Sequence, residues 1–244
     1  MRCLPLLSLL LLPALTLAEP AQPAALNRAF ELAGIRLLCE QSAPLIQRGL
    51  APAQQEQAAQ AFAAEALCGE LAEQVAGQLD AAEVRQVEAL LDSPLAQRFT
   101  AAERAVGEDG EGLAGYRAQL QSKPPRAERL ALVQRLDKAA HTTALATLLR
   151  YETGKTQALL ALRARGGQLS EQQLGEQTAK QLETLRASSE QAVESFMFYA
   201  YRQMPSGDLG DYAALYEQDP VRKLLDASLK ALPQVFAARR GMLK

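Results

Sequence analysis

Apolar residues recur at a spacing of three to four residues along most of the chain, which is the periodicity of amphipathic helices. The clearest example is residues 79–106, where an apolar face is interrupted once, at Asp92, Ser93 and Pro94. No stretch alternates apolar and polar residues with the β-branched side chains that favour strands. The pattern therefore predicts an all-α fold, a compact bundle of roughly eight to ten helices.

The interruption predicts two short helices joined by a tight corner. Asp80 is positioned to cap the first helix, and Glu83 three residues later completes a capping box. Ser93 offers its hydroxyl as the second cap, and Pro94 stands at the first helical position, where a proline costs no hydrogen bond. The expected buried faces are Val84, Val87, Leu90, Leu91, Leu95, Phe99, Ala102 and Val106.

A similar helix–corner–helix unit is expected in residues 204–232, so the pattern indicates a duplication inside one bundle. Here Ser206 is the expected first cap, and Asp219 with Pro220 forms the corner. A weaker third copy ends at Thr153 and Gly154. The alternative is that any helical protein rich in alanine and leucine contains such similarities. The second unit is expected to bury Leu209, Tyr212, Leu215, Tyr216, Leu224, Leu225, Ala227 and Leu232.

The runs VEALLDSPLAQRF and DLGDYAALYEQDPVRKLLDASLKAL carry a resemblance to a known family. They resemble the bacterial secreted family called domain of unknown function 2059, in which an acidic cap, an apolar or aromatic helix, a Ser-Pro corner and a basic residue follow one another. The first run departs from it by lacking an aromatic residue before the corner, and the second has Asp219 in place of Ser. The resemblance implies a fold and an extracytoplasmic compartment, and no activity.

The N-terminus has the pattern of a secretory signal peptide. Arg2 precedes an apolar run over residues 4–12, then Pro13 and a small residue, Ala18. We expect cleavage near Ala18, which makes residues 1–18 the signal peptide, residues 19–25 a flexible lead-in, and the mature protein periplasmic or secreted. The apolar run is shorter than the roughly 20 residues that a stable membrane span needs. An uncleaved anchor is the alternative.

Composition narrows the classes of partner. The formal net charge is −2 and the chain contains no tryptophan, so it lacks the basic surface and the stacking platforms of a nucleic-acid-binding protein. No apolar run besides the leader approaches membrane length, and we expect no stable membrane span.

Two cysteines remain after the leader, Cys39 and Cys68, and each lies on the apolar side of a helical stretch. A turn between them, at residues 47–52, is expected to fold the two stretches into an antiparallel hairpin. In an oxidising compartment this predicts a disulfide between Cys39 and Cys68. A redox-active pair is disfavoured because the two cysteines are far apart in sequence and have no CxxC spacing.

A proline-containing break is expected to divide the chain into two halves. Lys123, Pro124 and Pro125 form a stiff break between an N-terminal half, residues 26–122, and a C-terminal half, residues 126–240, although one continuous domain is the alternative. The glycine-rich residues 107–115 are expected to form a solvated loop. Residues 170–204 are expected to form the longest helix and the spine of the bundle.

Candidate chemistry is sparse. His141 is the only histidine, and Asp137 one helical turn earlier is placed to orient it as a general base, but no nucleophile is identifiable. Motifs for zinc proteases, serine hydrolases and nucleotide loops are lacking. We therefore expect no enzyme, no metal site and no cofactor.

Most aromatic residues lie near the end of the chain. Tyr199, Tyr201, Tyr212 and Tyr216 either pack in the core or rim an apolar cleft for a small apolar or lipidic ligand. The basic tail, with Arg239 and Arg240, is expected to complement a helix C-terminus. The leading hypothesis is an interaction or structural module of the cell envelope with an envelope protein as partner. A ligand carrier and an enzyme of unknown type are the alternatives.

Overall fold

The structure of the protein, a computed structural model, describes residues 19–108 and 110–243. Over these residues it contains helices and no strand, with one isolated bridge between Pro20 and Asp80. The all-α prediction is confirmed. The α-helices are α1 (Leu26–Leu32), α2 (Ile35–Gln47), α3 (Pro52–Ala61), α4 (Ala64–Ala76), α5 (Ala81–Leu91), α6 (Pro94–Glu108), α7 (Gly110–Ser122), α8 (Ala127–Ala140), α9 (Thr142–Arg163), α10 (Glu171–Thr178), α11 (Leu182–Ala200), α12 (Ser206–Tyr216) and α13 (Asp219–Met242).

There are more helices than the eight to ten expected, because short breaks divide stretches that read as continuous in the sequence. Gly34 has a φ of 75° between α1 and α2, and His141 has a φ of 52° between α8 and α9. A left-handed residue cannot continue a right-handed helix. The expected long helix over residues 170–204 is also divided, by a 3-10 segment, Ala179–Gln181, between α10 and α11.

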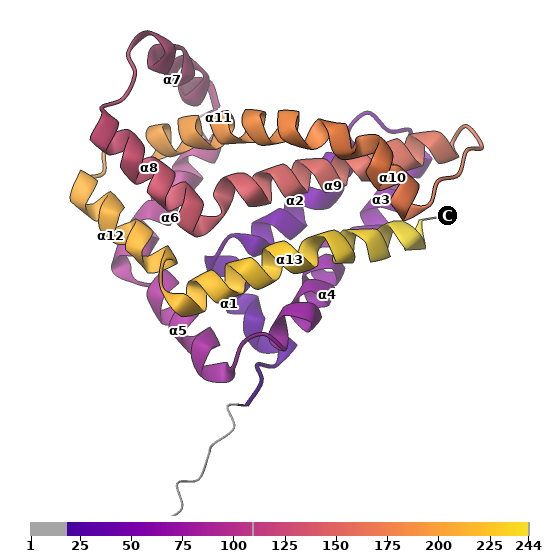
Figure 1. Ribbon diagram of the computed structural model, residues 1–244, viewed down its shortest axis with the longest axis horizontal. Coiled ribbons are helices and arrows are strands. Elements are labelled where there is room, and N and C mark those ends of the chain that lie inside the picture. The colour runs from indigo at the N-terminus through magenta and orange to yellow at the C-terminus, as the bar shows by residue number, and fades with distance from the viewer. Residues whose placement is uncertain (1–18, 109, 244) are drawn as a thin grey trace, which may run out of the picture.

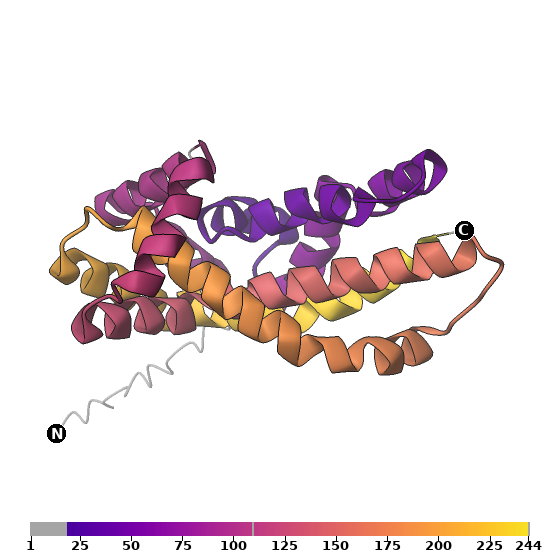
Figure 2. The ribbon, with the colours of Figure 1, turned by 90° about the horizontal axis from the view of Figure 1, so that it is seen from above.

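Helix α13 is the spine of the molecule. It is the longest helix of the described chain, with 24 residues, and it packs against α4, α5 and α9. Figure 1 shows it in yellow, crossing the molecule from α12 to the C-terminus, and Figure 2 shows the N-terminal helices as a layer separate from α9, α10 and α11. The residues of α13 that are fully buried include Val221, Leu224, Leu225, Ser228, Leu232, Val235 and Phe236.

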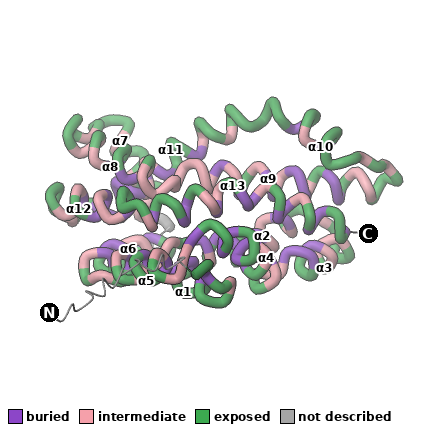
Figure 3. Tube along the Cα trace, turned by 60° about the horizontal axis from the view of Figure 1, so that its bottom comes forward, coloured by how far each residue is buried: buried purple, intermediate pink, exposed green. Residues whose placement is uncertain are grey.

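Burial follows the amphipathic pattern along most helices. In Figure 3 the buried residues lie on the faces that the helices turn toward one another, while α7 and α10 are mostly exposed. In α10 only Leu174 and Thr178 are buried. The core therefore sits between the N-terminal layer and the layer of α9 and α11, with α13 in contact with both.

The corner between α5 and α6 forms as predicted. The Asp80 carboxylate accepts hydrogen bonds from the backbone N–H groups of Ala82 and Glu83, both at 2.8 Å, and Glu83 Oε2 accepts from the Asp80 N–H at 2.9 Å. The Ser93 hydroxyl accepts from the backbone N–H of Ala96 at 3.4 Å, and Pro94 opens α6.

The other two corners differ from the prediction. Between α12 and α13 the caps fall one residue early, at Pro205 and Gln218, and Ser206 accepts a hydrogen bond from Arg129 instead. The third corner is wrong, because α9 runs unbroken through Thr153 and Gly154. The Thr153 hydroxyl donates to the Leu149 carbonyl at 2.7 Å, so it bonds within its own helix. The duplication is not confirmed.

Cys39 on α2 and Cys68 on α4 lie at disulfide distance, with their Cα atoms 5.9 Å apart. The turn after α2 is present, and Gly49 has a φ of 74° there. The two cysteine helices are not joined directly, however, because α3 lies between them in the chain. The expected two-helix hairpin is a three-helix arrangement.

The glycine-rich stretch is not the expected loop, since α6 continues to Glu108 and α7 starts at Gly110. Glycine costs about 1 kcal/mol in a helix interior, but packing offsets this cost: Leu113, Tyr116 and Leu120 of α7 contact the core. The break at residues 123–125 does separate α7 from α8. Helices from both sides of it pack together, as α6 does with α11 and α4 with α13.

The segment after the expected cleavage point is held in place. The backbone N–H of Ala21 donates to the Leu79 carbonyl at 2.9 Å, and the N–H of Ala81 donates to the Glu19 carbonyl at 3.2 Å. Ala21 is buried, so this part of the expected lead-in lies against the turn that joins α4 to α5. The predicted signal peptide, residues 1–18, lies outside the described residues. Within the described ranges, every helix is too short or too polar to cross a bilayer.

Candidate functional site

The four tyrosines predicted to line a cleft are all buried, and they form two separate packed groups. Tyr201, Tyr212 and Tyr216 gather around Glu103 of α6. Tyr199 faces Tyr116 of α7, with ring centroids 5.3 Å apart, and the Arg202 guanidinium lies 3.9 Å from the Tyr199 ring centroid. The structure therefore brings three of the four together and places the fourth elsewhere.

Glu103 is the polar centre of the larger group. The Tyr201 hydroxyl donates to Glu103 Oε1 at 2.5 Å, the Tyr212 hydroxyl lies 3.4 Å from the same atom, and the hydroxyls of Tyr212 and Tyr216 are 3.1 Å apart. The Phe99 ring stacks on Tyr212 at a centroid distance of 4.2 Å. The rings fill the space around the carboxyl group and hold one another, so this group is a packed centre.

Burial raises the pKa of the Glu103 carboxyl, although the tyrosine hydrogen bonds and the charge of Arg104 act against this rise. Burial likewise raises the pKa of the Tyr201 and Tyr212 hydroxyls. Glu103 is not among the candidate residues that the sequence pattern indicates. A signal was present, because Glu103 follows buried Phe99 by four residues and so falls on the inward face of α6.

His141 lies at the junction of α8 and α9. Its Nε2 atom is 2.9 Å from Oδ1 of Asp226 on α13. Asp137 does not orient the imidazole, because its carboxylate accepts from the Thr143 backbone N–H at 2.7 Å and from the Thr143 hydroxyl at 2.8 Å. His141 thus attaches the α8–α9 junction to α13. In the part of the chain that the structure describes, no three histidine, cysteine or acidic residues are grouped to hold a metal ion.

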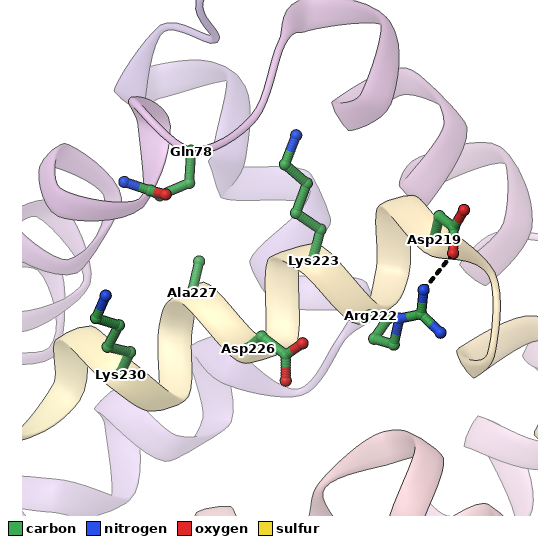
Figure 4. A pocket seen from close by; sticks show the side chains of 7 residues that line it. All are labelled: Gln78, Asp219, Arg222, Lys223, Asp226, Ala227 and Lys230. Atoms are coloured by element: carbon green, nitrogen blue, oxygen red, sulfur yellow. Dashed lines mark hydrogen bonds and ion pairs between the residues drawn. The ribbon is translucent and has the colours of Figure 1, made fainter.

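A surface pocket of about 410 Å³ lies between α13 and the turn that joins α4 to α5. We call it the α13 pocket, and Figure 4 shows its lining. The side chains that line it are Gln78, Asp219, Arg222, Lys223, Asp226, Ala227 and Lys230.

The pocket has a lysine on each side of a small residue. Lys223, Ala227 and Lys230 stand at positions i, i+4 and i+7, which share one helix face, and about 10 Å of helix axis separates the two lysines. In Figure 4 these three side chains point toward the side where Gln78 lies. Asp226 points away from Gln78, and Arg222 turns back to Asp219. The alanine leaves the space that larger side chains would fill.

Most charges of the α13 pocket are already paired. The Lys223 ammonium lies 2.7 Å from Oε1 and 2.9 Å from Oε2 of Glu83. Arg222 pairs with Asp219, and Asp226 pairs with His141. Lys230 is exposed and has no hydrogen-bond or ion-pair partner among the described residues. Sequence reasoning missed this site, whose signal was the lysine–alanine–lysine spacing on one helix face.

A second, apolar pocket of about 240 Å³ lies where α9, α11 and α13 meet. Leu182, at the start of α11, is 43% exposed there. The lining residues are Ala144, Thr147, Leu148, Leu182, Arg186 and Leu229.

Comparison of the chain with protein-family models, with curated proteins and with solved structures found no match. The resemblance to domain of unknown function 2059 therefore stays a prediction.

Proposed function

We propose that the chain is an exported helical module of the bacterial cell envelope that binds a protein partner through the α13 pocket. The observation that carries this proposal is the exposed, unpaired Lys230 in a polar hollow on the central helix. A protein that needed this surface only for solubility would gain nothing from a hollow between two lysines. A binding module gains a defined contact on the helix that packs against α4, α5 and α9.

The arrangement of the internal polar groups supports a binding role over an enzymatic one. Glu103 is engaged by tyrosines, and Glu152 pairs with Arg240 at 2.7 Å. The Nε2 atom of His141 faces Asp226, and none of the lining residues of the α13 pocket is a serine, cysteine or threonine. These groups stabilise one another, and none of the groups named here is a nucleophile facing a base, the pair that acyl transfer requires.

The export part of the proposal rests on the leader pattern and on the disulfide distance between Cys39 and Cys68. Intact-mass measurement of protein from the periplasm or medium tests it. We expect the mass of residues 19–244 less two hydrogens. A full-length mass in the cytoplasmic fraction would contradict export.

In-cell photo-crosslinking tests the binding role. A photoreactive amino acid at position 227, inside the α13 pocket, is expected to give a discrete adduct. The same amino acid at position 53, exposed on α3, serves as the matched control. An adduct at both positions, or at neither, would argue against the α13 pocket as the interface.

The alternative of a ligand carrier gains its support from the apolar pocket between α9, α11 and α13, and not from the tyrosines. Its small volume and its exposed Leu182 suit one end of an apolar chain. Native mass spectrometry of protein purified without detergent tests this alternative: a bound mass that disappears in Leu182→Asp supports it.

A further inference from the structure

We infer that the α13 pocket recognises a carboxylate-rich peptide segment of the partner, with Lys230 as the main contact and Lys223 and Gln78 as supporting contacts. This inference rests on the proposed function and adds the chemistry of what is bound. It depends on which charges of the pocket remain available, on their spacing and on the groups that face them.

The unpaired charge in the pocket is the positive charge of Lys230. Its two acids are each engaged, Asp219 by Arg222 and Asp226 by His141, and Asp226 is turned away from Gln78. Lys230 keeps all three of its N–H donors. Glu83 takes two donors of Lys223 and leaves one. An incoming anion can therefore use the three donors of Lys230, one donor of Lys223 and the Gln78 amide, while Glu83 stays paired with Lys223.

The spacing of the donors favours two separate acidic groups over one compact anion. About 10 Å of helix axis lies between Lys223 and Lys230, with only the methyl group of Ala227 between them. Carboxylates two residues apart on an extended peptide lie on the same side and about 7 Å apart, within reach of two flexible lysine side chains. The Gln78 amide both donates and accepts, so it can hydrogen-bond the peptide backbone that passes over Ala227.

Other anions fit the pocket less well. Phosphate recognition commonly uses the planar fork of an arginine, but Arg222 is turned to Asp219. A broad anionic membrane surface would meet the exposed Asp219 and Asp226 beside the lysines and a chain whose net charge is −2. A short acidic peptide reaches the lysines without covering the acids.

The direct test is the binding of fluorescently labelled octaglutamate to the mature protein at low salt, with octaglutamine as the neutral control. We expect saturable binding of octaglutamate only, weakened by added salt because the contacts are exposed charges. Lys230→Gln should weaken it about five- to tenfold, and Lys223→Gln should weaken it less. Lys230→Arg should retain most of the affinity.

The matched control is Lys180→Gln, which removes an exposed lysine outside the pocket and should bind like the unchanged protein. Lys230 is exposed, so its variants should keep the helical circular-dichroism spectrum. Equal affinity in Lys230→Gln and Lys180→Gln would overturn the inference. So would binding of octaglutamine.

Two competition experiments distinguish an acidic peptide from other sources of negative charge. Inorganic phosphate and vesicles containing phosphatidylglycerol are tested as competitors. If either binds more tightly than octaglutamate in a Lys230-dependent way, the peptide assignment is wrong. Competition no stronger than that of an equal ionic strength of sodium chloride supports the peptide assignment.

Carbodiimide coupling locates the contact. This reagent joins a lysine amine to a carboxylate as an amide with loss of water, and peptide mapping should place the octaglutamate bond at Lys230. Coupling spread evenly over the surface lysines would contradict the inference. If position 227 gives an adduct in cells but octaglutamate does not bind, the pocket is an interface for a partner that is not recognised through carboxylates, and this inference is wrong. Failure of both would remove the proposed function as well.

Discussion

The Nη1 atom of Arg240 lies 2.7 Å from Oε2 of Glu152, and both side chains are almost completely buried. Glu171 of α10 covers this pair, with its carboxylate 2.5 Å from Arg240 Nη2 and 2.9 Å from Lys155 Nζ. The neighbouring Arg239 pairs with Glu70 of α4 at 2.9 Å. The basic residues expected to complement a helix C-terminus are therefore internal, and they fix the end of α13 to α4, α9 and α10.

Removing one partner of this buried pair should be costly, because an unpaired buried charge remains. We expect Arg240→Ala to lower the free energy of unfolding by about 3–5 kcal/mol, measured by urea denaturation. Arg222→Ala removes an exposed arginine paired with Asp219 and should cost at most about 1 kcal/mol. Equal costs for the two variants would show that the internal network does not hold α13.

Glu103 should make the stability depend on pH. Its pKa is raised by burial in the folded state, so the folded form keeps the proton more tightly than the unfolded form does. The free energy of unfolding should therefore fall as the pH rises from the ordinary carboxyl pKa of about 4.3 through the raised value.

Glu103→Gln should remove this loss, because the amide keeps an acceptor for Tyr201 without the charge. Above the raised pKa we expect the variant to be more stable than the unchanged protein by about 1–2 kcal/mol, with little difference at acid pH. Denaturant curves across the pH range measure this difference. Glu73→Gln, which removes an exposed carboxyl group of α4, is the control for the loss of one acid.

The pairing of Cys39 and Cys68 closes a loop with a sequence separation of 29 residues. In the chain-entropy model such a loop adds about 3–4 kcal/mol to the free energy of unfolding. Adding a reductant, or making the Cys39→Ser and Cys68→Ser double variant, should lower the denaturation midpoint accordingly. A thiol assay that finds two free cysteines in unreduced mature protein would contradict the pairing.

Gly34 should resist substitution because its φ of 75° lies in the left-handed region. Gly34→Ala is expected to cost about 1–2 kcal/mol, measured by thermal or urea unfolding. Gly69 provides the opposite case, since it is exposed inside α4 with open space around its Cα, and Gly69→Ala should stabilise by about 0.5–1 kcal/mol. The same sign for both variants would rule out backbone conformation as the cause.

Local chemistry made the α5–α6 corner predictable. Asp80, Glu83, Ser93 and Pro94 act within a few residues of where they stand, and each takes its expected place in the structure. The pairing of Cys39 and Cys68 could also be predicted. The two cysteines lie on apolar helix faces, and the sequence after the leader contains no other cysteine. The all-α class followed from periodicity alone.

Long-range contacts explain what sequence reasoning missed. Thr153 and Gly154 resemble a corner, yet neighbouring Glu152 and Thr156 are buried against α13 and keep α9 continuous. Arg240 looked like a terminal cation because its acidic partners, Glu152 and Glu171, are distant in sequence. The helical spacing nevertheless held a signal. Arg239 and Arg240 each lie four residues after a buried residue, Val235 and Phe236, and so share its helix face.

The position of α13 also bears on the order in which the molecule can be completed. A ribosome makes this helix after the other described helices, although it packs against α4 and α5 near the start of the described chain and against α9 in the middle. Until residues 219–242 emerge, the apolar faces of those earlier helices lack their shared partner. A nascent chain stopped before residue 219 would therefore remain open to proteases and chaperones, however many of its residues had already been synthesised.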